Sequence, residues 1–86
     1  MRGGFITRMQ IVLTLRTVVG VTMKPEVQTS DTIAMVKAKI AEGWKLPSDR
    51  KICLSLKDGM ILEDEHTLAH YQIEQDTFIC VILGPI

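Results

Sequence analysis

The chain has 86 residues, of which 47% are hydrophobic and 23% charged, and its ten basic and ten acidic residues give a formal net charge of zero. This length and composition are typical of one small globular domain, and the balanced charge favours neither nucleic acid nor an anionic membrane as a partner. No apolar run approaches the ~20 residues of a membrane span, and residues 1–8 lack the apolar stretch of a signal peptide. Two cysteines are too few for a disulfide scaffold, so the expected compartment is the cytoplasm or the nucleus.

The first predicted elements are two strands joined by a turn. Apolar residues alternate with more polar ones at the start of the chain, a pattern that predicts a strand with one buried face: Ile11, Leu13 and Leu15. Residues 17–20 are expected to turn the chain, with Gly20 as the residue that adopts positive φ. The alternation resumes at Val21 and is interrupted at Pro25, which cannot donate to a ladder. The second strand of this hairpin is therefore expected at a sheet edge.

A helix of about three turns is predicted next. The cluster from Thr29 to Thr32 contains residues that cap helix N-termini. The residues that follow are apolar at helical spacing and form one stripe: Ile33, Val36, Ile40 and Ala41. Gly43 is expected to end the helix, and Pro47 prevents its continuation. Such a stripe is usually buried against a sheet.

Alternation returns in the second half of the chain. Ile52, Leu54 and Leu56 are expected to share one face of a strand, and Cys53, Ser55 and Lys57 the other. Asp58-Gly59 predicts a hairpin turn followed by a short return strand at residues 60–62. The connection after it is expected to be anchored by a few larger side chains: Leu68, Tyr71 and Ile73.

The last element, residues 78–83, contains almost no polar residue, which is typical of a central strand. Ile79 and Val81 are predicted to face the helix. Phe78, Cys80 and Ile82 are then predicted to face outward and to form a contact surface, because one helix covers only one side of a sheet.

Several of these segments resemble ubiquitin. They are the opening Met9 to Ile11, the helical segment from Ser30 to Ile40, the Leu46-Pro47 step, and the block from Leu62 to Ile73. The resemblance covers residues 9–83, with 1–8 and 84–86 as tails. It implies an α+β fold, the β-grasp, in which a mixed five-stranded sheet carries one main helix across one face and a short helix precedes the last strand.

The resemblance also implies a function. It is that of a non-catalytic ubiquitin-like interaction module, part of a larger protein in the ubiquitin–proteasome pathway. Ubiquitin grips partner helices around an isoleucine on the third strand and a valine and a histidine on the fifth. Ile82 matches the valine and Cys80 the histidine, while the isoleucine falls on Cys53 in the preferred register, or on Ser55 or Leu54 in others. Phe78 adjoins them. The implied partners are ubiquitin-binding-type domains or proteasome and shuttle receptors, bound by a monomer.

The sequence departs from ubiquitin at its end, where Gly84-Pro85 stands in place of a diglycine tail. Conjugating enzymes thread the tail through narrow clefts, and proline fixes φ and adds bulk. A conjugated modifier processed from a longer precursor is therefore an alternative function. Trp44 is open to two interpretations, as an exposed binding anchor or as a side chain folded against Leu46.

A zinc or redox site is the remaining alternative. Its candidate residues are Cys53, Cys80, His66 and His70. The spacing is unlike that of known zinc motifs, because no short Cys-x-x-Cys pair is present. Neither a cofactor nor an enzymatic activity is predicted. In the preferred register, Cys53 and Cys80 lie opposite one another on the outer face, within reach of a disulfide.

Overall fold

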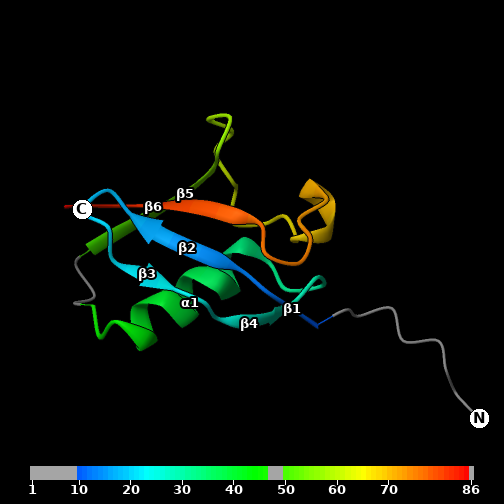
Figure 1. The fold of residues 1–86 in the computed structure, drawn as a ribbon, viewed down its shortest axis with the longest axis horizontal. Coiled ribbons are helices and arrows are strands. Elements are labelled where there is room, and N and C mark those ends of the chain that lie inside the picture. Colours follow the sequence, from blue (N-terminus) through cyan, green and yellow to red (C-terminus); the bar gives the residue numbers. More distant parts are fainter. Residues whose placement is uncertain (1–9, 47–49, 86) are drawn as a thin grey trace, which may run out of the picture.

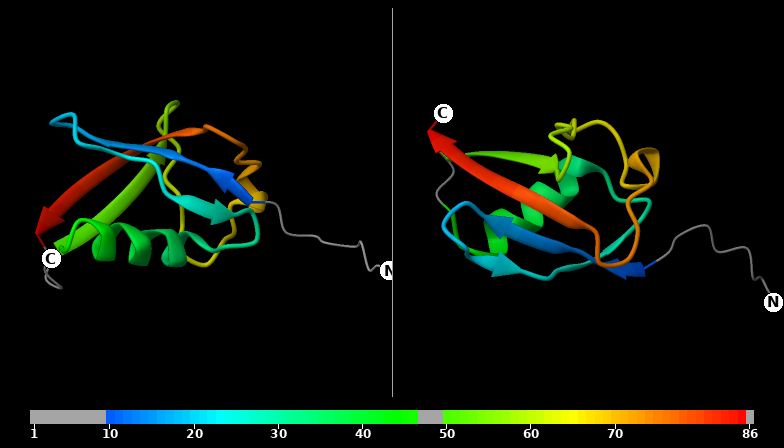
Figure 2. Two further views of the ribbon diagram at one scale, coloured as in Figure 1. Left: turned by 60° about the horizontal axis from the view of Figure 1, so that its bottom comes forward. Right: turned by 45° about the horizontal axis from the view of Figure 1, so that its top comes forward.

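The computed structural model describes residues 10–46 and 50–85. Within them, one α-helix, α1 (Ile33–Gly43), packs across one face of a mixed β-sheet (Figures 1 and 2). The predicted α+β arrangement is therefore confirmed. The predicted tail at residues 1–8 and the predicted stop at Pro47 lie outside the described residues. No helix in the described ranges has the length and apolarity that crossing a membrane requires.

Both strands of the predicted first hairpin are broken into two short pieces. The first strand comprises β1 (Gln10–Val12) and β2 (Thr14–Thr17), and the second comprises β3 (Thr22–Met23) and β4 (Glu26–Gln28). β1 pairs with β4 and β2 pairs with β3, in both cases antiparallel.

Pro25 lies at the break in the second strand. It has no N–H to donate, but its carbonyl accepts a hydrogen bond from Leu13 N–H at 3.1 Å, so the hairpin stays joined. The four-stranded sheet has the order β3-β2-β6-β5, which places β3 at an edge, as predicted. Gly20 turns the chain with φ +92°, as predicted.

The N-terminus of α1 follows the sequence prediction. Thr32 is the cap, and its hydroxyl oxygen accepts a hydrogen bond from Met35 N–H at 3.2 Å. Ile33, Val36 and Ile40 are fully buried against the sheet.

The C-terminus of α1 differs from the usual pattern, in which a glycine takes the left-handed conformation after the helix. The helix ends at Gly43, as expected, but the residue with left-handed backbone is Lys45, at φ 52°. Leu46 N–H donates to the carbonyl of Ala41 at 2.9 Å and Lys45 N–H donates to that of Glu42 at 3.3 Å, the two bonds of a Schellman motif. Gly43 instead lies against the end of the flexible Met23 side chain, which would have to shift to admit a Cβ at this position.

The four-stranded sheet is completed by β5 (Arg50–Leu56), at the edge opposite β3, and by β6 (Phe78–Pro85), which lies inside the sheet. β6 runs parallel to β2 and antiparallel to β5, which makes it the central strand that its apolar sequence predicts. It also extends beyond the predicted domain end. Gly84 pairs with Lys51 and Pro85 with Arg50, so these two positions belong to the strand and not to a tail.

The segment between β5 and β6 has less regular structure than predicted. The turn at Gly59 has φ +96°, but the expected return strand is reduced to a bridge between Ser55 and Ile61. A 3-10 helix, η1 (Ala69–Tyr71), follows. Leu68 and Ile73 are buried on either side of it and anchor the connection, as expected.

Candidate functional site

The outer face of β5 and β6 is the first candidate surface. α1 lies against the opposite face of the sheet (Figure 2). Alternation along β6 buries Ile79 and Val81 beneath the sheet, as predicted. Phe78 and Cys80 are half-buried on the outer face, and Ile82 keeps 44% of its surface exposed. With Cys53 of β5, these residues form what is called here the outer apolar surface.

The pairing of β5 with β6 corrects the preferred register. Cys53 lies opposite Ile82, and the residue opposite Cys80 is Ser55, one of the alternatives that the sequence left open. The third alternative is excluded because Leu54 pairs with Val81 and is fully buried.

The observed register differs from the predicted one by two residues. The ladder continues to Gly84 and Pro85, whereas the prediction ended the strand at Leu83. Cys53, predicted opposite Cys80, lies two positions further along β6, opposite Ile82. A slide of two leaves every side chain on its predicted face and changes only its neighbour, since the side-chain period of a strand is two.

The two cysteines are consequently diagonal neighbours. Both are half-buried free thiols, and Cys53 does face outward as predicted. Diagonal positions on one face are about 7–8 Å apart, beyond the Cα separation of about 4.4–6.8 Å that a disulfide requires. The prediction that Cys53 and Cys80 lie opposite one another, within reach of a disulfide, is therefore wrong.

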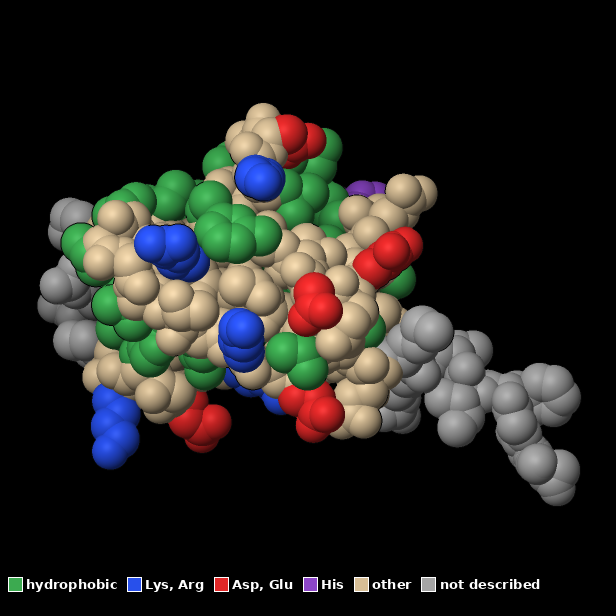
Figure 3. Space-filling model, viewed as in Figure 1, with side chains coloured by type: hydrophobic (Ala, Val, Ile, Leu, Met, Phe, Trp, Pro, Cys, Tyr) green, Lys and Arg blue, Asp and Glu red, His purple; other side chains and the backbone are tan. Residues whose placement is uncertain are grey.

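Basic side chains flank the outer apolar surface. Arg16 of β2 lies opposite Cys80, and Lys51 shares the outer face of β5 with Cys53; both are exposed. Beyond β5, Met60 and Ile61 expose about half of their surface. Figure 3 shows hydrophobic side chains over β6 and around the projecting loop after β5, with basic side chains among them.

A second apolar surface lies at the turn of the first hairpin. It is a hollow of about 490 Å³. Val18 and Val19, in the hairpin turn, are 88% and 80% exposed. Trp44 is half-buried against the core and lines the hollow beside Leu46. Trp44 and Leu46 are both partly buried residues that pack against the core cluster. The full lining is Thr17, Val18, Val19, Val21, Trp44, Leu46, Val81 and Leu83.

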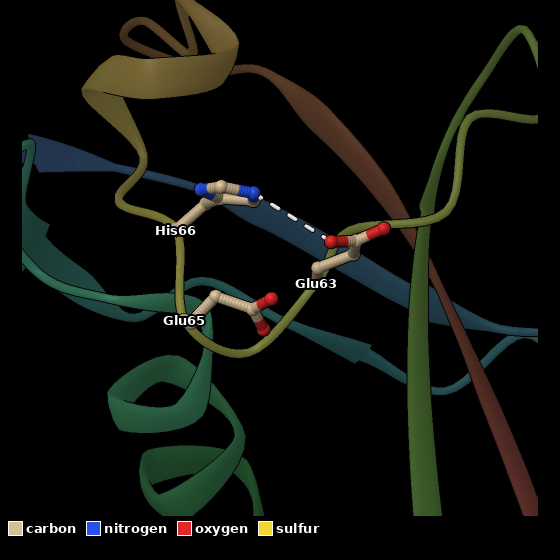
Figure 4. A group of neighbouring side chains, drawn as sticks. All are labelled: Glu63, Glu65 and His66. Atoms are coloured by element: carbon tan, nitrogen blue, oxygen red, sulfur yellow. Dashed lines mark ion pairs between the residues drawn. The ribbon is translucent and has the colours of Figure 1, made fainter.

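The proposed grouping of two cysteines and two histidines is not assembled. Among the described residues, the potential metal ligands that gather are Glu63, Glu65 and His66, whose ligand atoms lie within 4.8 Å of one another (Figure 4). His70 stacks on His66, with ring centroids 4.0 Å apart. The sequence signal for this cluster is the run of acidic residues directly before His66, within the connection between β5 and β6.

Comparison with known protein families adds one finding to this geometry. A family model described as "Ubiquitin family" matches residues 13–86. The match covers the hairpin from Leu13 onward, α1, β5, η1 and β6. It agrees with the arrangement of one main helix on a mixed sheet, and the predicted β-grasp fold is confirmed.

Proposed function

The chain belongs to the ubiquitin family, and from that premise we propose that it is a non-catalytic protein-interaction module that binds through the outer apolar surface. The observation that carries this proposal is the exposure of Ile82. It lies on a central strand whose inward neighbours, Val81 and Ile79, are completely buried, yet 44% of its own surface faces solvent. Burial of that surface by a partner would gain about 25 cal/mol per Å² of apolar area.

The partner is expected to present an apolar side chain flanked by acidic residues. Phe78 and Ile82 offer apolar contacts, while the exposed Arg16 and Lys51 lie at the margins of the surface. Complementary acidic groups would speed association and fix orientation more than they would add affinity. Helical ubiquitin-binding-type domains and the receptors of the proteasome and its shuttle proteins are the class of partner that we propose.

The cellular setting is part of the same proposal. The module acts as a monomeric domain of a larger protein in the ubiquitin–proteasome pathway, in the cytoplasm or the nucleus. The two free cysteines support a reducing compartment, because in that setting they serve as small apolar side chains of the surface.

The test compares two charge insertions at exposed apolar residues. Ile82→Asp lies in the outer apolar surface, and Met35→Asp lies on the solvent side of α1, where Met35 is 50% exposed. Titration of a panel of purified ubiquitin-binding domains is expected to give at least a ten-fold weaker Kd for Ile82→Asp, equal to about 1.4 kcal/mol. Met35→Asp should bind within two-fold of the unmodified chain.

Thermal melts of both variants serve as the folding control, since each substitution is at a solvent-exposed position. The proposal fails if Ile82→Asp binds as tightly as the unmodified chain, or if Met35→Asp weakens binding equally.

A further inference from the structure

The loop before η1 carries a group of potential metal ligands that is separate from the outer apolar surface. We propose that Glu63, Glu65 and His66 bind a divalent transition metal ion of the zinc type. Their ligand atoms lie within 4.8 Å of one another (Figure 4). Tetrahedral zinc with bonds of 2.0–2.2 Å needs its ligands about 3.4 Å apart. Rotation of the two exposed glutamate side chains closes that difference without moving the backbone.

The backbone that carries these ligands is already held in place. Glu63 N–H donates to the hydroxyl oxygen of Tyr71 at 2.8 Å, and His66 N–H donates to the carbonyl of Glu63 at 3.2 Å. The carbonyl of His66 in turn accepts from Ile33 N–H, at 2.9 Å, at the start of α1. The loop is thus tied to both η1 and α1, which lowers the ordering cost of binding an ion.

The acidic residues of the loop differ in whether they form an ion pair with a basic side chain. Asp64 is used structurally, because its carboxylate forms an ion pair with Lys37 at 2.5 Å. Glu63 and Glu65 are exposed, and within the described residues neither forms an ion pair with a lysine or an arginine. Oε1 of Glu63 instead lies 3.6 Å from Nε2 of His66, close enough for both atoms to bind one ion. Two carboxylates therefore remain to neutralise a divalent cation.

His66 supplies the preference for a transition metal. Imidazole suits zinc, copper and nickel, whereas Ca²⁺ and Mg²⁺ select oxygen ligands. Its ring is oriented by stacking on His70, with centroids 4.0 Å apart and planes 7° from parallel, and by the edge of Tyr71. The nitrogen lone pairs of two nearly parallel rings point along separate planes and do not meet at one ion. His70 is therefore a positioning residue, and water fills the open coordination sites.

The test titrates Zn²⁺ into the full chain carrying Cys53→Ser and Cys80→Ser, so that thiols do not compete. Calorimetry should give one site per chain, and amide NMR shifts should concentrate in residues 63–71. His66→Ala is expected to weaken binding at least ten-fold, and Glu63→Gln or Glu65→Gln several-fold. Glu42→Gln, an exposed acid on α1, is the matched control and should bind as the parent does. Zn²⁺ should raise the melting temperature of the parent and not of His66→Ala.

Three outcomes would overturn the proposal. The first two are undiminished Zn²⁺ affinity in His66→Ala and Ca²⁺ binding as tight as Zn²⁺ binding, because either would mean that the carboxylates merely attract cations. The third concerns His70. His70→Phe preserves an aromatic ring for stacking and should retain the parent affinity, whereas His70→Ala should lose a few-fold. A loss in His70→Phe as large as that in His66→Ala would make His70 a ligand and refute the three-ligand geometry.

Discussion

At the scale of single residues, the end of α1 has its left-handed backbone and its glycine at two different positions, Lys45 and Gly43. Left-handed backbone after a helix usually falls on glycine, because a Cβ is strained there. Here Lys45 takes that conformation, at φ 52°, while the glycine of the segment, Gly43, leaves room for the Met23 side chain. The C-terminus of the helix is therefore closed by a residue that is not suited to its backbone.

Lys45→Gly is accordingly expected to stabilise the domain. Relief of a left-handed L-residue is worth roughly 1–2 kcal/mol, and the extra entropy of glycine in the unfolded chain offsets about 0.5–1 kcal/mol of it. The expected net gain is about 0.5–1 kcal/mol in the free energy of unfolding, measured by urea denaturation. Lys24→Gly is the matched control, because Lys24 is exposed and lacks positive φ. It should show no gain, and an equal gain in both variants would disprove the explanation.

At the scale of elements, the pairing of β5 with β6 decides which side chains form the outer apolar surface. Seven residue pairs join the two strands, from Arg50 with Pro85 to Leu56 with Ile79. This register joins Cys53 to Ile82 and Ser55 to Cys80. The two thiols are therefore not opposite one another, and the half-buried Cys53 lies beside Ile82, the most exposed residue of the surface.

The register predicts the outcome of oxidation. Mild oxidation of the unmodified chain should leave Cys53 and Cys80 without an intramolecular disulfide, since diagonal neighbours are too far apart. The combined variant Cys53→Ser and Ser55→Cys places a thiol directly opposite Cys80 and should form one. Mass spectrometry after thiol labelling distinguishes the two. Rapid closure of a Cys53–Cys80 bond in the unmodified chain would contradict the pairing.

At the scale of the whole molecule, one cluster of buried apolar residues joins nearly every element. It draws on β1, β2, β4, α1, β5, β6 and the connection between the last two strands. Val36 lies within it, on the buried face of α1. Domains of this size have only a few kcal/mol of net stability, so damage to the shared cluster is expected to unfold all of it together.

Val36→Asp should therefore abolish folding, because it buries a charge with no partner in the core. The matched control is Ala38→Asp, which places the same side chain on the exposed side of α1. It should change the free energy of unfolding by no more than about 0.5 kcal/mol. Circular dichroism and thermal melting distinguish these outcomes. A cooperative melt of Val36→Asp near that of the unmodified chain would be incompatible with the packing of α1.

The sequence by itself determined the features that depend on neighbouring residues. The helical spacing of Ile33, Val36 and Ile40 predicted both the helix and its buried face, and the period of two in β6 separated Val81 from Ile82. The cluster of capping residues before the helix was equally local, and it contains the observed cap, Thr32. These patterns are set by backbone geometry within one or two turns or a few strand residues, so they can be recognised without knowledge of what packs nearby.

Only the tertiary structure decided how these elements are matched to one another. The register of β5, the close approach of Met23 to Gly43 and the hollow beside Trp44 all bring together groups from different segments. A period-two pattern is unchanged when a strand slides by two residues, so the sequence predicted the outer face of β5 but not the partner of Cys80. That choice depends on the full length of the β5–β6 ladder, which is fixed by contacts between residues far apart in the chain.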